Sequence, residues 1–411
     1  MIDRTIYKEI LQAIKEKPIV FVLGARGIGK TTLCELIEKD LGFGYVSLSN
    51  PLARLEATID PAEFLCLHQA PLIIDEIQKA PILFDYLEGA VDEAKRQGKK
   101  ESLYVLTGSE TYKLMKGVTE SMCGRVAFIH MSPLSLSEVK GVEELPFEAD
   151  PIKAMARAKD NAFTSPELYA TIVRGLYPEL YDKPYLKTAS FYADYLESYL
   201  AKDVSDILQV NNRGKFLNLM CLLASLTGQE LIYSNLAKGI GIDVKTVQGW
   251  VSVLEAGNII HLLQPYSEMS IAKQLVHRPK VYFSDTGLAC FLAKVNGPEM
   301  LEASYLKGRM VETFIVNEIM KSYRNARKEG EAGFYYYRDA QGNEVDLVIL
   351  KDGQLSLLEC KSGEKHDLSE VSGFRQLEKS RYPIKHKAII CPCREAMPLG
   401  KGVYALPISA I

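Results

Sequence analysis

The stretch "PIVFVLGARGIGKTT", residues 18–32, decides the fold of the first part of this chain. An apolar run from Ile19 to Leu23 leads into G-x-x-x-x-G-K-[ST] at Gly24–Thr31, and a helical pattern follows. Glycines let backbone N–H groups wrap around phosphates, and the N-terminus of the following helix adds its dipole to the anion site. The pattern therefore predicts a phosphate-binding loop between a buried strand and a helix.

Individual roles follow from the chemistry of the bound phosphates. Lys30 is expected to reach the β- and γ-phosphates of ATP, and Thr31 to hold Mg²⁺. The predicted nucleotide-binding residues of the loop are Gly24, Ala25, Arg26, Gly27, Ile28, Gly29, Lys30, Thr31 and Thr32.

The stretch "PLIIDE" supplies the acidic half of this site. Asp75 ends a buried apolar strand, where a bare carboxylate is costly without a partner, and Mg²⁺ at the strand end is such a partner. Glu76 follows it and is predicted to orient or deprotonate the attacking water.

Short continuous apolar runs alternate with helical stretches over the first part of the chain, as parallel strands covered on both faces do. The predicted fold is a doubly wound parallel-sheet P-loop NTPase domain of the α/β class, then a helical lid and a winged helix, then an α/β restriction-endonuclease-like domain. We predict boundaries at 1–145, 146–225, 226–300 and 301–411.

The middle of the chain, "ELIYSNLAKGIGIDVKTVQGWVSVLEAGNIIHLLQPY", has the rhythm of two helices around a Gly-containing turn, followed by a hairpin. This favours a winged helix-turn-helix. Its basic residues, Lys238 and Lys245, are opposed by Glu230, Asp243 and Glu255. Because phosphate neutralisation dominates DNA affinity, the composition favours packing or protein contact over DNA binding.

Near the end of the chain, Asp352-Gly353 is the dipeptide of a two-residue hairpin turn. With that turn, Asp346 faces Glu359 and Glu344 faces Lys361 across the hairpin. Opposed carboxylates repel, and a divalent cation between them removes the repulsion. An Asp followed by Glu-x-Lys on the next strand resembles the PD-(D/E)XK nuclease core.

That resemblance implies a metal site at Asp346 and Glu359, with Lys361 positioning or activating water. Glu312, which falls among apolar residues of a predicted helix, is expected to approach the same site. The alternative is structural: a Glu344–Lys361 ion pair, with the other carboxylates bonded to backbone. The predicted metal ligands of the whole chain are Thr31, Asp75, Glu312, Asp346 and Glu359.

Several further stretches resemble bacterial and archaeal AAA-type ATPases that carry a C-terminal domain of unknown function. They are "DEIQKAP", "LTGS", "GRVAFIHMSPLSLSE", "RGLYPEL", "YLAKDVSDI", "YFSDTGLACFL" and "EVDLVI". The resemblance implies that Thr107 or Ser109 senses the γ-phosphate, that Arg174 is a second sensor, and that Pro178 flanks the adenine. It also implies that Arg125 is an arginine finger acting on a neighbouring subunit, which would make the protein a homo-oligomer. The alternative for Arg125 is a local salt bridge.

Composition sets outer bounds on these interpretations. The chain has 411 residues, 47% of them hydrophobic, and a formal net charge of −3, so two or three domains are expected and no strongly basic surface is indicated. No signal peptide or spanning segment is apparent, and the eight scattered cysteines suit reduced thiols, so a cytoplasmic protein without a membrane partner is expected.

Three functions remain open from the sequence. In the first, Mg²⁺-dependent ATP hydrolysis drives or switches a C-terminal domain that recognises a partner. In the second, the C-terminal domain is an ATP-gated, Mg²⁺-dependent nuclease acting on DNA or RNA. In the third, the winged helix makes the protein a DNA-binding regulator.

Overall fold

The computed structural model describes residues 2–98, 102–108, 122, 124–160, 163–202, 212–268 and 278–411. It separates into two compact units. The N-terminal unit comprises Asp3–Pro133 and Ala256–Asn258, and the C-terminal unit comprises Ile2, Leu134–Glu255 and Ile259–Ile411. The N-terminal unit thus ends ahead of the predicted boundary at residue 145, and the three later predicted domains share one unit.

The N-terminal unit is built on a five-stranded parallel sheet with the order β2-β3-β4-β1-β5. Its central strands are fully buried because their apolar side chains are covered on both faces, as the continuous apolar runs predict. The doubly wound parallel sheet is thereby confirmed. The strands are β1 (Ile19–Leu23), β2 (Gly44–Ser47), β3 (Leu72–Asp75), β4 (Tyr104–Gly108) and β5 (Val126–His130).

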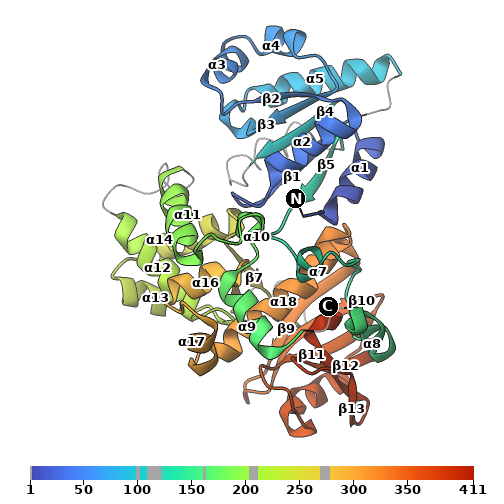
Figure 1. Ribbon diagram of the computed structural model, residues 1–411, viewed down its shortest axis with the longest axis vertical. Helices are drawn as coiled ribbons and strands as arrows, with labels where there is room; N and C mark the ends of the chain where they lie inside the picture. The colour runs from blue at the N-terminus through green and yellow to red at the C-terminus, as the bar shows by residue number, and fades with distance from the viewer. Residues whose placement is uncertain are drawn as a thin grey trace. The chain divides into compact units, whose positions relative to one another are not determined.

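Helices connect these strands and pack on the sheet, as the blue and cyan part of Figure 1 shows. Two of the short helices begin with proline after an Asn or Asp cap whose side chain accepts a backbone N–H, a favourable helix start. The helices of this unit are α1 (Ile6–Glu16), α2 (Lys30–Leu41), α3 (Pro51–Ile59), α4 (Pro61–Leu67), the 3₁₀ turn η1 (Ile77–Lys79) and α5 (Leu83–Arg96).

The C-terminal unit begins with helices. They are α7 (Leu136–Lys140), α8 (Pro151–Asp160), α9 (Ser165–Arg174), α10 (Pro178–Asp182), α11 (Thr188–Lys202) and α12 (Arg213–Ser225).

A helix pair and a small sheet follow. Helices α13 (Tyr233–Ile240) and α14 (Val244–Ala256) flank a short turn at Gly241, which is left-handed with φ 72°. The same region contains three short strands, β6 (Gln229–Glu230), β7 (Ile260–Leu263) and β8 (Lys280–Phe283). They form an antiparallel sheet with the order β6-β8-β7. The two helices and the Gly-containing turn between them are as the sequence predicts, and the winged-helix assignment stays a prediction.

The last part of the chain forms a six-stranded mixed sheet with the order β13-β14-β12-β11-β10-β9. Strands β10 and β11 form the predicted hairpin around Asp352-Gly353, and Lys351 pairs with Gln354. The strands are β9 (Ala332–Arg338), β10 (Glu344–Lys351), β11 (Gln354–Cys360), β12 (Ile384–Cys391), β13 (Met397–Gly400) and β14 (Val403–Pro407).

The remaining helices of the C-terminal unit are drawn in orange and red in Figure 1. They are α16 (Thr286–Leu292), α17 (Pro298–Ala303), the long α18 (Lys307–Asn325), and the 3₁₀ segments η3 (Glu329–Glu331), η4 (Leu368–Lys379) and η5 (Ile408–Ala410). Side chains of η4 join a buried apolar cluster with β10, β11 and β12.

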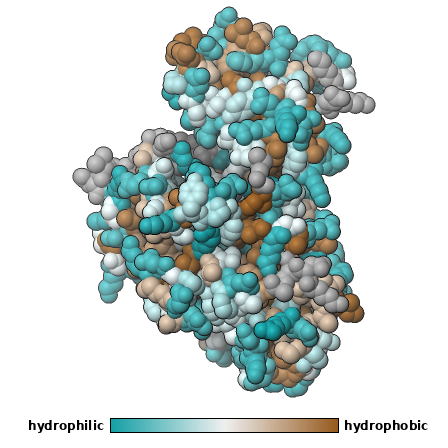
Figure 2. Space-filling model, in the orientation of Figure 1, coloured by the Kyte–Doolittle hydropathy of each residue, from teal (hydrophilic) through white to brown (hydrophobic). Residues whose placement is uncertain are grey.

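The surface in Figure 2 is mostly hydrophilic or mixed, with hydrophobic residues gathered over α3 and α4. Leu52, Leu55, Ile59 and Leu67 are the exposed apolar side chains of these two helices. Within the part of the chain that the structure describes, no helix is both long and apolar enough to cross a membrane.

Candidate functional site

The phosphate loop joins the buried strand β1 to the N-terminus of α2. Gly27 and Gly29 take positive φ values of 76° and 95°, which glycine adopts without steric cost. Gly24 has φ 152°, and a Cβ there would lie 2.7 Å from the backbone oxygen of Met131. The glycines of the motif are therefore required by backbone conformation and by close packing beneath the loop.

Lys30 is held inside the curve of this loop. Its Nζ donates hydrogen bonds to the carbonyl oxygens of Gly24 and Ala25, each at 2.9 Å, and the residue is only 7% exposed. A buried ammonium at the N-terminus of a helix suits an anionic ligand.

The hydroxyl of Thr107 contacts both acidic residues predicted for this site, Asp75 and Glu76. Thr107 at the end of β4 donates its Oγ1 hydrogen to Asp75, and the same oxygen accepts the backbone N–H of Glu76 at 3.2 Å. The other oxygen of Asp75 accepts from Tyr45 Oη and Ser47 Oγ, both at 3.1 Å. Burial and the charge of Asp75 raise the pKa of Tyr45, so the phenol stays a donor. Parallel strand order explains this meeting, because β2, β3 and β4 end at one edge.

Glu76 has an uncommon backbone conformation for a residue with a side chain. Its φ of 59° and ψ of 44° lie in the left-handed region, directly after the buried end of β3. Its carboxylate accepts a hydrogen bond from the Gln78 amide. Left-handed residues other than glycine cost free energy and cluster at functional sites, which agrees with a chemical role for Glu76.

Arg125 makes ion pairs inside its own unit, with Glu88 at 3.1 Å and Asp92 at 2.9 Å. The hydrogen bond from Arg125 lowers the pKa of Asp92. This is the local salt bridge that the sequence left open, and the arginine-finger role stays a prediction.

The remaining residues carried over from the resemblance lie in the C-terminal unit. Arg174 ends α9 and donates to the carbonyl oxygens of Leu180 and Pro184, and Pro178 is the first residue of α10. Their proposed contacts with nucleotide stay predictions. Ser109 lies outside the described residues.

The predicted C-terminal residues do meet. Asp346 and Glu359 share a side-chain hydrogen bond, and Lys361 Nζ lies 3.2 Å from Glu359 Oε2. The backbone N–H of Cys360 donates to Asp346 Oδ2 at 2.9 Å. Burial first and the charge of Asp346 second raise the pKa of Glu359. Burial alone would also raise the pKa of Asp346. The charge of Lys280 and the Cys360 N–H outweigh burial, so the pKa of Asp346 is lowered.

A residue that the sequence reasoning missed stands among these carboxylates. Lys280 Nζ lies 2.6 Å from Glu344 Oε1 and 2.8 Å from Glu312 Oε1. Tyr282 also donates its hydroxyl hydrogen to Glu312 Oε1 at 2.6 Å, and burial raises the pKa of Glu312 to about 7. The only signal in the sequence is a lysine beginning the otherwise apolar strand "KVYF".

The alternative Glu344–Lys361 ion pair is wrong. Glu344 pairs with Lys280 and, at 3.8 Å, with Arg338, whereas Lys361 pairs with Glu359. The physical reason is local: the ladder between β10 and β9 shifts between Val345 and Val348, and Lys361 bonds through its backbone N–H to Ile390 of β12. Across the described ranges, no group of three or more His, Cys, Asp or Glu side chains is arranged to hold a metal ion.

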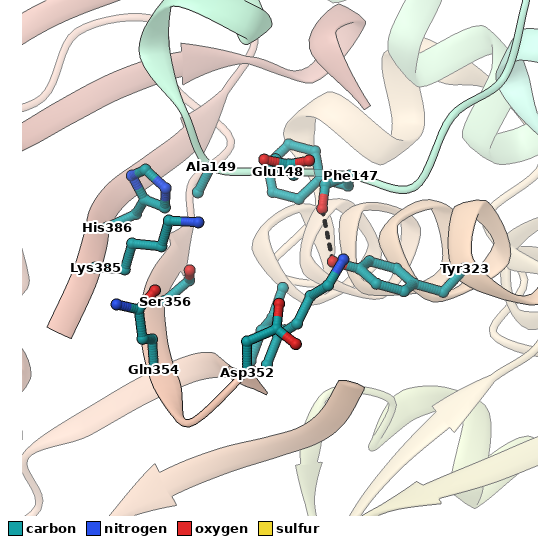
Figure 3. Close-up of a pocket in the computed structure, with 11 residues that line it drawn as sticks. Phe147, Glu148, Ala149, Tyr323, Asp352, Gln354, Ser356, Lys385 and His386 are labelled. Carbon is teal, nitrogen blue, oxygen red and sulfur yellow. Dashed lines mark hydrogen bonds between the residues drawn. The ribbon is translucent and has the colours of Figure 1, made fainter. Parts of the chain in front are cut away.

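A separate pocket lies in the same unit, between residues 147–149, the end of α18 and the hairpin turn (Figure 3). Tyr323 donates its hydroxyl hydrogen to the carbonyl oxygen of Phe147 at 2.8 Å across this pocket, and the Lys351 ammonium stands 5.4 Å from the Tyr323 ring centre. None of the predicted site residues lines it.

Together, the parallel sheet, the glycine-rich loop around Lys30 and the Asp75–Thr107–Glu76 arrangement define a P-loop nucleotide-binding domain of the AAA type. Residues 16–140 match the family described as AAA domain. Residues 165–299 and 307–411 match two domains of unknown function, DUF8612 and DUF4143. The chain is therefore an AAA-type P-loop ATPase with a C-terminal domain of unknown function.

Solved structures similar to this chain include a Walker-type ATPase. The Walker-type ATPase PABY2304 of Pyrococcus abyssi is 16% identical, covers 71% of this chain and 96% of its own, and has a TM-score of 0.41. RuvB of Thermotoga maritima (R170A) is 16% identical, covers 63% and 89%, and has a TM-score of 0.32. Orc1 of Aeropyrum pernix in complex with DNA is 12% identical, covers 70% and 91%, and has a TM-score of 0.28. A comparison with curated proteins finds no match.

Proposed function

We propose that this protein hydrolyses ATP with Mg²⁺ and that its nucleotide state switches a nuclease-like C-terminal domain that recognises a partner. The observation that carries the first half is the Thr107 hydroxyl, which joins Asp75 and the backbone of Glu76 beside the phosphate loop. This arrangement fixes both acids relative to β4 before any ligand binds. Preorganised groups of this kind lower a barrier because they need no rearrangement during the reaction.

The residues present fit ATP and Mg²⁺. The loop N–H groups and Lys30 would hold the β- and γ-phosphates, and Thr31 with Asp75 would hold the metal ion. When bound, ATP supplies the phosphoryl group that water attacks. Glu76 would hold and polarise that water, and Thr107 would report on the γ-phosphate through its bond to Asp75.

The second half of the proposal concerns the partner. Helices α13 and α14 with β6, β7 and β8 have the element order of a winged helix, and we assign them as one. Its charges are mixed, which favours contact with a protein partner over DNA binding by α14.

A second candidate is an ATP-gated nuclease acting on DNA or RNA. The meeting of Asp346, Glu359 and Lys361 favours it, because these are the residue types of the PD-(D/E)XK core. Against metal-dependent cleavage stands Lys280, whose ammonium lies among the carboxylates of Glu312, Glu344 and Asp346. We therefore rank recognition above cleavage.

Two variants test the ATPase assignment. Lys30→Ala should lose ATP affinity by at least about tenfold, since it removes a charge-assisted phosphate contact. Glu76→Gln should keep ATP but reduce phosphate release by about a hundredfold or more, since the amide cannot accept the proton. Calorimetry measures the first and phosphate release the second.

Glu93→Gln, an exposed change on α5, serves as the matched control and should behave as wild type. Wild-type turnover by Glu76→Gln would remove Glu76 from the mechanism. Strand breakage of DNA and RNA, followed in the same reactions, separates the two candidate functions: cleavage abolished by Lys361→Ala would establish the nuclease.

A further inference from the structure

The strongest unassigned feature of the C-terminal unit is the contact set of one lysine. Lys280 is 1% exposed, and its Nζ lies 2.6 Å from Glu344, 2.8 Å from Glu312 and 3.4 Å from Asp346. An ammonium has three N–H donors, so three carboxylates use its full capacity. Few lysines are buried this deeply, and those that are need such partners.

The lysine and its partners come from different parts of the chain. Lys280 begins β8, inside the segment 165–299 that matches one domain of unknown function. Glu312 lies on α18, and Glu344 and Asp346 lie on β10, all within the segment 307–411 that matches the other. The three-stranded sheet therefore places a charge in the centre of the next domain's carboxylates.

The chemistry of this position decides which cation it holds. Carboxylate oxygens gathered around one point are the ligands that Mg²⁺ and Mn²⁺ also take. The ammonium already stands there, and a divalent ion beside it would be repelled at close range. Packing alone does not account for a lysine at this position, because the buried carboxylates of Glu312 and Asp346, with the partly exposed Glu344 beside them, would be strongly unfavourable without a cation.

We propose that Lys280 is the built-in cation of the C-terminal centre, so that the centre takes a divalent ion only when this ammonium is removed. The proposal rests on the nuclease-like assignment of that centre and specifies which cation the centre holds. It makes Lys280 a positioning residue that keeps Glu312, Glu344 and Asp346 together in a metal-free arrangement.

The test uses the full chain without nucleotide and compares Lys280→Met with Lys321→Met. Lys321 is the matched control because it is also a buried lysine, 4% exposed, yet its Nζ bonds one carboxylate, Glu318 at 2.7 Å, and the carbonyl of Leu134 at 2.8 Å. Bound Mn²⁺ is counted by electron paramagnetic resonance, and melting temperature is followed with and without millimolar Mn²⁺.

Lys280→Met should gain one bound Mn²⁺ over wild type, and adding Asp346→Asn should remove it again. Both lysine variants should melt below wild type, but Mn²⁺ should restore part of the loss only in Lys280→Met. No gain of Mn²⁺ by folded Lys280→Met, or equal restoration in Lys321→Met, would overturn the proposal.

A second measurement applies even if Lys280→Met does not fold. With Lys280 in place, Asp346→Asn should leave the number of bound Mn²⁺ ions unchanged. If that variant loses an ion relative to wild type, the metal reaches the centre beside Lys280 and the proposal is wrong. Because nucleotide is absent, failure of the ATPase assignment would not affect either result.

Discussion

At the scale of single residues, the main property of the C-terminal centre is the ionisation of its two adjacent carboxyl groups, Asp346 and Glu359. Asp346 and Glu359 share a hydrogen bond in a buried position, and two charged carboxylates cannot both be accommodated there. Burial and the charge of Asp346 raise the pKa of Glu359, whereas Lys280 and the Cys360 N–H lower the pKa of Asp346 against the effect of burial, so a proton shared by the pair is held more strongly by Glu359. Lys280 and Lys361 flank the pair from two sides.

This arrangement makes stability depend on pH in a definite direction. A carboxyl group whose pKa is higher in the folded chain takes up a proton on folding, so its contribution is full below the unfolded pKa and is lost as pH rises through the folded pKa. Glu359→Gln cannot titrate and keeps an N–H donor for Asp346. We expect its loss of unfolding free energy between pH 5 and 8 to be smaller than that of wild type by about 1 kcal/mol or more.

Urea unfolding at several pH values measures this difference. Glu378→Gln is the control, because Glu378 is exposed and its bond to Lys387 lowers its pKa, away from this range. A pH dependence as steep in Glu359→Gln as in wild type would contradict the shared-proton assignment.

At the scale of elements, the centre depends on how closely η4 approaches β10. Gly373 of η4 lies against the backbone of Glu344, and a Cβ on it would lie 2.8 Å from the Glu344 carbonyl carbon. Backbone atoms of a sheet cannot move aside as a flexible side chain can. The glycine therefore permits the contact that holds the beginning of β10 in position.

Gly373→Ala should lower the free energy of unfolding by about 1–3 kcal/mol, since overpacking a dry contact forces the backbone apart. Gly249→Ala, inside α14 with open space around its Cα, should instead raise it by up to about 1 kcal/mol through helix propensity. Thermal and urea unfolding measure both. If the two changes had equal effects on the free energy of unfolding, the close contact between η4 and β10 would not require a glycine at position 373.

At the scale of the whole molecule, the proposed switch requires that nucleotide bound by the N-terminal unit bias the C-terminal unit. A ligand shifts an equilibrium only by its difference in affinity for two states, and such couplings typically amount to about 1–3 kcal/mol. The chain passes between the two units at Ile2–Asp3, at Pro133–Leu134, and on either side of Ala256–Asn258, which belongs to the N-terminal unit although it lies between parts of the other.

Hydrogen exchange with mass spectrometry tests the coupling. In Glu76→Gln held with ATP and Mg²⁺, amides of the C-terminal unit should change their protection relative to the ADP state, by about tenfold for a coupling of 1.4 kcal/mol. Lys30→Ala should show no such change. Exchange differences confined to the N-terminal unit would contradict the switch.

Much of the N-terminal site was predictable because its parts are local or follow from one rule. The loop Gly24–Thr31 is contiguous, and Asp75 and Thr107 both end apolar strands, so a parallel sheet brings them to one edge. The hairpin register was predictable for a similar reason, because Asp352-Gly353 sets the pairing of its neighbours.

What the sequence by itself determined is therefore the set of features with short sequence separation or strict period: the phosphate loop, the parallel strands, and the meeting of Asp346 with Glu359. Only the tertiary structure decided which cation those carboxylates hold. Lys280 is far from Glu312 and Asp346 along the chain, and neither strand period nor turn type links β8 to β10. Burial explains why the cation is Lys280. A buried ammonium and buried carboxylates are each costly alone, and they are stable only where the fold brings them together.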